Sequence, residues 1–308
     1  MGDEQSLIKR ILFATDFSSC AQHAEEYVAF LANAYEARVT ILHVPEIYEG
    51  AYVTTIQDPS ETHERLDDVV RRLAQPAGRV KYQQRAGIPD TIICETAEEA
   101  RADLIVLGTH GRTGLQHVLL GSTTERVLTM APCPVLAIRK LEEVEGHGAT
   151  KPIHFKRIAV PIDFSDCSLD ALKYGVQIAK NFGAFLTLLH SLEPLSYGSD
   201  LTFGHTAEQN RQQIATRLKL VADEVQSQGI SVRAVIRGGL PADSILDFID
   251  GSHCDLIVMG THGRRGLSHL VKGSVAEAVL RRASCPVLAA KYFTLSRSGR
   301  SSVSARRT

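Results

Sequence analysis

The residues best placed to do chemistry in this chain of 308 residues lie in two glycine-rich stretches with the same spacing. Each stretch reads Gly-x2-Gly-x9-Gly-Ser, after a short apolar run and before a segment with helical character. Glycines with positive φ let a backbone turn and approach a ligand closely. A serine at the N-cap, free N–H groups and the positive end of a helix dipole suit a phosphate. The two copies are Gly108, Gly111, Gly121 and Ser122, and Gly260, Gly263, Gly273 and Ser274. A tight strand-to-helix connection without a ligand would need the same order, so that interpretation stays open.

The chain is an internal duplication. Residues 108–139 and 260–291 share 19 identities in 32 aligned positions. Asp16 and Asp163 also correspond, after the first apolar run of each half. The pattern predicts strands at 10–14, 39–44, 79–85, 103–107, 134–138, 157–161, 185–190, 231–236, 255–259 and 286–290. It predicts helices at about 18–35, 59–74, 87 onward, 123–130, 166–182, 206–228, 241–251 and 275–282.

Five strands alternating with helices in each half predict a mostly parallel sheet covered on both faces. Ligands of such α/β sheets bind at the carboxyl ends of the strands, where the strand order reverses. Asp16 follows the first strand and Gly108 follows the fourth.

Further residues make the chain resemble the universal stress protein family. These are Thr15-Asp16-Phe17-Ser18, Ile162-Asp163-Phe164-Ser165, Leu42-His43-Val44 and Leu189-His190-Ser191, together with both glycine stretches. The resemblance covers nearly the whole chain, twice. It implies two tandem Rossmann-like domains of the adenine nucleotide alpha hydrolase type, each a five-stranded parallel sheet of order 3-2-1-4-5 with helices on both faces. In that order the first and fourth strands flank the point of reversal, so the motifs and the fold rule predict the same crevice.

The resemblance also implies two sites for an adenine nucleotide. Asp16 would approach the sugar or the adenine, and Val39 would line the adenine pocket. Gly108 and Gly111 would pass over the ribose and phosphates, and Gly121 and Ser122 would bind phosphates. The equivalents in the second half are Asp163, Leu186, Gly260, Gly263, Gly273 and Ser274. For both aspartates, hydrogen bonding to the local backbone of a turn is an alternative.

Charge differs between the two loops. The first carries Arg112, whereas the second carries Arg264, Arg265 and Lys272. Because cations add charge-assisted hydrogen bonds to phosphates, we expect tighter and more salt-dependent ATP binding in the second half. The alternative is that the added cations point to solvent.

Composition excludes several classes of function. The net charge of −1 gives no global attraction to nucleic acid or to an anionic membrane, and no apolar run is long enough to span a bilayer. No P-loop lysine motif is present, and no Cys-x2-Cys pair indicates a zinc site. We therefore expect no catalytic residues and no protein-bound metal site. Six cysteines without a secretion signal favour reduced thiols in a cytoplasm.

Two functional hypotheses remain. The first is a nucleotide-binding module that senses or regulates in the stress response, with ATP, alone or with Mg²⁺, as its ligand. The second is an interaction scaffold that binds no nucleotide. Because some relatives hydrolyse ATP weakly, enzymatic activity stays open. The protein partners are unknown.

We expect the first domain at 1–140, a linker at 141–154, the second domain at 155–292 and a basic tail at 293–308. The last strand of each half is an edge strand, and edge strands seek partners. Residues 134–138 and 286–290 are near copies, which predicts an intramolecular pseudo-dimer through these strands. A further homodimer is compatible with this arrangement.

Overall fold

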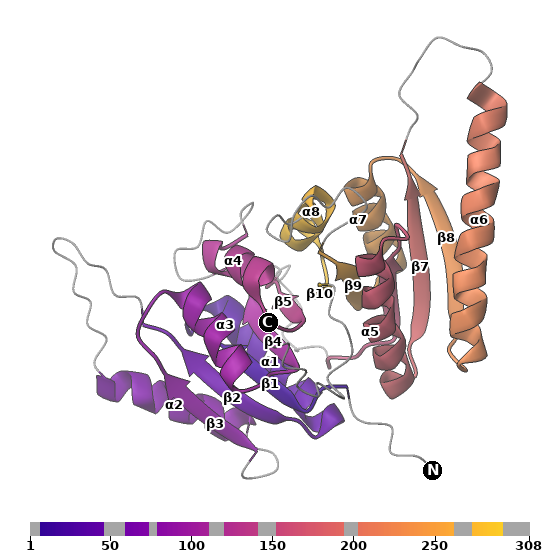
Figure 1. Cartoon of the computed structure of the whole chain (residues 1–308). Helices are drawn as coiled ribbons and strands as arrows, with labels where there is room; N and C mark the ends of the chain where they lie inside the picture. The colour runs from indigo at the N-terminus through magenta and orange to yellow at the C-terminus, as the bar shows by residue number, and fades with distance from the viewer. Residues whose placement is uncertain are drawn as a thin grey trace, which may run out of the picture.

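The computed structural model describes residues 7–45, 59–73, 79–110, 120–140, 152–193, 203–261 and 273–291 (Figure 1). Its strands form one ten-stranded sheet of order β3-β2-β1-β4-β5-β10-β9-β6-β7-β8. The strands of the first half are β1 (Arg10–Ala14), β2 (Arg38–His43), β3 (Val80–Gln84), β4 (Leu104–Gly108) and β5 (Val135–Ile138). Those of the second half are β6 (Arg157–Pro161), β7 (Phe185–Leu192), β8 (Val232–Gly238), β9 (Leu256–Gly260) and β10 (Val287–Ala290).

Within each half all the strand pairs are parallel, and the order is the 3-2-1-4-5 that the sequence predicted. The helices of the first half are α1 (Ser19–Tyr35), α2 (Pro59–Leu73), α3 (Pro89–Glu99) and α4 (Ser122–Met130). Those of the second half are α5 (Asp166–Phe182), α6 (Phe203–Ser227), α7 (Pro241–Ser252) and α8 (Ser274–Arg282). Most ends lie within one or two residues of the predicted ones. Among the described residues, no helix is long and apolar enough to cross a membrane.

The helices form a layer on each face of the sheet. Alternate strand residues point to opposite faces, so Ile11 and Phe13 belong to one core cluster and Leu12 to the other. The first cluster is covered by α1, α2, α5 and α6, and the second by α3, α4, α7 and α8. Strands buried on both faces explain the continuous apolar runs in the sequence.

The two halves meet at the centre of the sheet, as the near-identical last strands predicted. β5 and β10 pair in antiparallel register, with Leu136 opposite Leu288 (Figure 1). The pairing leaves neither strand as an edge.

Two cationic side chains form hydrogen bonds between the halves at this centre. Lys291, after β10, donates to the carbonyls of Thr129 and Ala131 at the end of α4. Arg139, after β5, donates from Nη1 to the carbonyl of Arg281 in α8 at 2.8 Å. Cations at helix C-termini satisfy carbonyls that lack a partner within the helix and oppose the negative end of its dipole. Each half therefore supplies a cation to the end of a helix in the other half.

Candidate functional site

Two loops converge at the carboxyl ends of β1 and β4, where the strand order of the first half reverses. β1 pairs with β2 on one side and with β4 on the other. Ser18, after β1, approaches the carbonyl of His110, after β4, with its hydroxyl at 3.4 Å. In the second half β6 pairs with β7 and β9 in the same way. The loops that carry the motifs therefore lie side by side at the topological switch point.

The aspartates after the first strand of each half hold a tight turn. Asp16 Oδ1 accepts the N–H of Ser18 at 3.0 Å, and Asp163 Oδ1 accepts the N–H of Ser165 at the same distance. Ser165 Oγ also donates to Asp163 Oδ1 at 2.6 Å. These bonds are the local role that the sequence left open as an alternative, and they fix both carboxyl groups in the turns that follow β1 and β6.

The next residue of each turn has an unusual backbone. Phe17 and Phe164 both have φ of 61°, in the left-handed region that bulky residues rarely adopt. Such a conformation costs about 1–3 kcal/mol and persists only where the surroundings hold it. The Phe17 ring lies 4.6 Å from the ring of His43, and the Phe164 ring lies 5.2 Å from that of His190. The same strained position occurs in both halves.

The histidines at the ends of β2 and β7 support these turns from inside the sheet. His43 Nδ1 lies 2.8 Å from the carbonyl oxygen of Thr15, and His190 Nδ1 lies 2.5 Å from that of Ile162. Both histidines are buried. The strand ends Leu42-His43-Val44 and Leu189-His190-Ser191 formed part of the sequence resemblance, but the positioning role of the histidines emerges only from the contacts.

The helix starts at Gly121 and Gly273 are left without a side-chain cap. The sequence placed Ser122 and Ser274 at the N-caps, and this was wrong, because Gly121 and Gly273 are the N-caps and the serines begin the helices. The N–H of Gly121 is bonded to Thr109 O at 2.8 Å, which anchors the cap residue to the end of β4. By contrast, Ser18 and Ser165 cap α1 and α5 through their hydroxyls. The first turns of α4 and α8 thus offer N–H groups that no side chain of the described residues caps.

Close backbone packing explains the glycines at the strand ends, and the expected positive φ does not. Gly108, Gly121, Gly260 and Gly273 are absent from the residues with positive φ. A Cβ on Gly108 would lie 3.0 Å from Cys20 Sγ and 3.1 Å from the N of Ala21. A Cβ on Gly260 would lie 2.9 Å from the carbonyl carbon of Cys167. These two glycines therefore let α1 and α5 approach the sheet.

Gly121 differs from these two, because a Cβ there would meet the backbone after β4 and not a helix. Its φ of −59° and ψ of 139° are open to any residue. A Cβ there would lie 3.1 Å from the carbonyl oxygen of Thr109. Thr124 adds a hydroxyl bond to the carbonyl of Gly108 at 2.9 Å, so the end of β4 and the start of α4 form one rigid corner.

Val39 and Leu186 do not lie at the carboxyl edge of the sheet, where the other predicted residues meet. Val39 pairs with Ile11 near the amino ends of β2 and β1, and Leu186 pairs with Ile158 near those of β7 and β6. Both are fully buried in the core cluster under α1, α2, α5 and α6. At about 3.3 Å per residue, Val39 lies roughly 13 Å from His43 at the carboxyl end of its strand.

Val44, directly after β2, is the half-buried apolar residue that reaches the predicted edge. In the parallel register, Ala14 at the end of β1 lies opposite Leu42, so Val44 follows β2 at the same edge at which Asp16 follows β1.

Several predicted residues lie outside the described part of the chain. These are Gly111, Arg112, Gly263, Arg264, Arg265 and Lys272. Among the described residues, no group of three or more His, Cys, Asp or Glu side chains could hold a metal ion.

All six cysteines are free thiols. Burial raises the pKa of Cys94 and of Cys254 to about 11, so both thiols are protonated at neutral pH. Cys20 and Cys167 are buried, and each donates to a carbonyl of the last strand of its half. Cys20 and Cys167 therefore pack as small side chains between a helix and the sheet.

Comparison with known proteins agrees with this architecture. The sequence model of the universal stress protein family matches residues 7–139 and again 154–291. Universal stress protein MJ0531 of Methanocaldococcus jannaschii is 34% identical over 143 residues, covering 44% of this chain and 82% of that protein. A universal stress protein of Mycolicibacterium smegmatis is 26% identical over 292 residues, covering 90% of this chain and 95% of that protein.

Among solved structures, that of a universal stress protein from Archaeoglobus fulgidus superposes with a TM-score of 0.70 at 25% identity. The match covers 93% of this chain and 99% of the archaeal chain. Both halves thus match the family in sequence, and the arrangement of the halves matches a solved member. The chain belongs to the universal stress protein family, with two of its domains in tandem.

Proposed function

We propose that this protein binds an adenine nucleotide, ATP in the first instance, in the crevice of each half, and acts in the stress response as a regulatory module. The observation that carries the proposal is the uncapped first turn of α4 and of α8, beside the turn that holds Asp16 or Asp163. Free N–H groups and the helix dipole favour a phosphate there. Membership of a family whose nucleotide signature the chain carries twice supports the same ligand.

The residues divide the work by position. Gly121 and Ser122, with Gly273 and Ser274 in the second half, provide backbone N–H groups and a hydroxyl for phosphate oxygens. The Asp16 and Asp163 turns face the sugar or the base. Val44 replaces Val39 as the apolar wall in the first half. The proposed domain bounds are those expected from the sequence: 1–140 and 155–292, with a linker between them and a tail from 293.

Mg²⁺ would accompany the phosphates and be held mainly by them, because a bound nucleotide supplies the oxygen ligands that Mg²⁺ prefers. The described residues provide bonds that position and orient a ligand, and we assign none of them to a step of hydrolysis. The nucleotide would then bias the contacts of the protein with partners in the cytoplasm.

The test is direct. Purified full-length protein is denatured, and the supernatant is separated by ion-exchange chromatography. Adenine nucleotide in stoichiometric amount, or calorimetric binding of Mg-ATP to protein without bound nucleotide, supports the proposal. No released nucleotide together with no heat of binding refutes it and leaves the scaffold hypothesis. Gly251→Ala is the matched control for Gly121→Ala, because it adds the same methyl group in α7, where Gly251 has open space around it.

A further inference from the structure

A cavity of about 180 Å³ lies between α1 and α2 of the first half. Phe17 borders it below the Asp16 turn, Gln22 and Glu25 line it from α1, and Arg65, Asp68 and Arg72 line it from α2. An apolar cavity of about 150 Å³ holds a benzene molecule. The space therefore admits a molecule of roughly six to eight non-hydrogen atoms, far smaller than a nucleotide.

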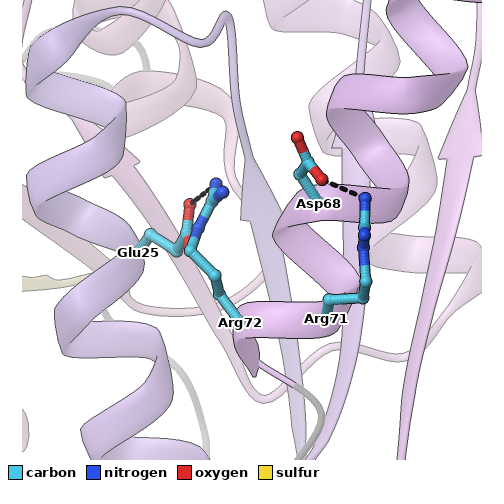
Figure 2. A network of polar contacts seen from close by, with 4 residues as sticks. All are labelled: Glu25, Asp68, Arg71 and Arg72. Atoms are coloured by element: carbon cyan, nitrogen blue, oxygen red, sulfur yellow. Dashed lines mark hydrogen bonds and ion pairs between the residues drawn. The ribbon is translucent and has the colours of Figure 1, made fainter.

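The carboxylates of this cavity already have cationic partners. Glu25 is only 8% exposed, and Arg72 contacts it with Nε at 2.6 Å from Oε1 and Nη2 at 3.0 Å from Oε2. Asp68 pairs with Arg71 one turn along α2. Figure 2 shows Arg72 extended towards Glu25 on α1, while Asp68 and Arg71 pair on their own helix. A cationic ligand would find both carboxylates occupied.

Arg65 adds a positive charge to the lining beyond those that pair with Glu25 and Asp68. Its guanidinium lies over the Phe17 ring at 4.3 Å from the centroid, and Nη2 lies 3.5 Å from the Phe17 carbonyl oxygen. No carboxylate of the described residues pairs with it. A guanidinium has five N–H donors in a planar fork that fits carboxylate and phosphate groups. Arg72, after its two bonds to Glu25, also has donors left. Two guanidinium groups with spare donors thus line one small cavity.

The second half shows that the fold does not require this lining. Gln22, Glu25 and Asp68 correspond to Leu169, Leu172 and Leu220. Thr15 and Arg72 correspond to Ile162 and Glu224. Leu172 is buried in the core cluster, where Glu25 lies in the first half. Arg217 stacks on Phe164 at 4.1 Å, as Arg65 does on Phe17. The corresponding helix of the second half therefore packs onto the sheet with a buried leucine at the Glu25 position, whereas Leu220, at the Asp68 position, is exposed.

Burying an ion pair usually brings little stability relative to apolar residues of the same size. Leu172 demonstrates that an apolar residue suits the position of Glu25. The buried Glu25 carboxylate, which holds Arg72 at the cavity, therefore needs a reason other than packing, and a ligand of Arg72 supplies one. We propose that this cavity is a second binding site, for a small organic anion whose carboxylate or phosphate group contacts Arg65 and Arg72. Gln22 offers hydrogen bonds to the rest of the molecule.

The experiment uses the full chain and two probes, pyruvate and inorganic phosphate, followed by ligand-detected NMR titration. Arg65→Gln removes the surplus cation, and Arg217→Gln is the matched control in the second half. A fourfold variant, Q22L/E25L/D68L/R72E, copies the residues of the second half, so its packing has a precedent within the same chain. Circular dichroism checks that each variant is folded.

We expect one probe to bind the wild type with Kd of about 1 mM or below. Affinity should fall at least about tenfold in Arg65→Gln and in the fourfold variant, and stay unchanged in Arg217→Gln. Preference for pyruvate identifies a carboxylate ligand, and preference for phosphate a phosphorylated one. The proposal is overturned if neither probe binds, or if the fourfold variant binds like the wild type. Nucleotide release from the same variants should stay at the wild-type level, which separates this site from the crevice.

Discussion

An alanine at Gly108 tests the role that the structure gives to the glycines at the strand ends. The added Cβ would lie 3.0 Å from Cys20 Sγ, 3.1 Å from the N of Ala21 and 3.1 Å from the carbonyl carbon of Cys20. Two of these three atoms are backbone in the first turn of α1, so the helix itself must shift. Overpacking of this kind costs about 1–3 kcal/mol. We expect Gly108→Ala to lower the free energy of unfolding by that amount.

The assay is urea unfolding followed by circular dichroism, with the midpoint and slope compared between variants. Gly251→Ala is the matched control, because its Cβ would meet nothing within 4 Å in α7. Alanine there should raise stability by about 0.5–1 kcal/mol. Adding Cys20→Ala to Gly108→Ala should not restore stability, since it removes only the sulfur contact. If Gly108→Ala unfolds at the wild-type midpoint, α1 does not need a glycine beneath it.

Three further outcomes follow from the same contacts. Arg72→Leu should destabilise the protein by about 1–3 kcal/mol, since it leaves the Glu25 carboxylate buried without its partner; adding Glu25→Leu should recover most of the loss in urea unfolding, and no recovery would contradict the account. Burial lowers the pKa of the Lys291 ammonium below its usual 10.5, so the folded protein loses the Lys291 proton at a lower pH than the unfolded chain does. The free energy of unfolding, relative to that of Lys291→Met, should therefore rise with pH up to 10.5. A difference between the two proteins that does not change with pH would contradict this. Gly121→Val and Gly273→Val should each weaken ATP binding to their own half at least about tenfold by calorimetry, and the site remaining in Gly121→Val should show the steeper salt dependence; equal affinity and slope in both variants would exclude a contribution from the second loop's cations.

The positions of strands and helices were predictable because local physics sets them. Apolar runs buried on both faces define the strands, and Ser18 marks the start of α1 through its own hydroxyl. The repeat then predicted the contact between β5 and β10, because two copies of one edge strand can pair with each other. Each of these inferences needs only residues that are close in sequence, or the comparison of one half with the other.

The candidate site was predictable in place but not in every residue. Val39 was misassigned because apolar character shows that a residue is buried, whereas the pairing register shows which end of the strand it occupies. Ser122 was misassigned as the N-cap because the sequence does not contain the bond from the N–H of Gly121 to Thr109. A glycine at position 108 is compatible with a backbone that approaches a ligand and with one that approaches a helix, and the sequence does not distinguish the two.

The sequence by itself determined the duplicated α/β plan, the strand order through its family resemblance, and the edge of the sheet where the motifs meet. Only the tertiary structure decided which atoms press on Gly108, how His43 supports the Asp16 turn, and that Glu25 and Arg72 face one another in a cavity. Those contacts join residues that are 28 to 88 positions apart. Their distances depend on how the helices pack on the sheet, which no local pattern encodes.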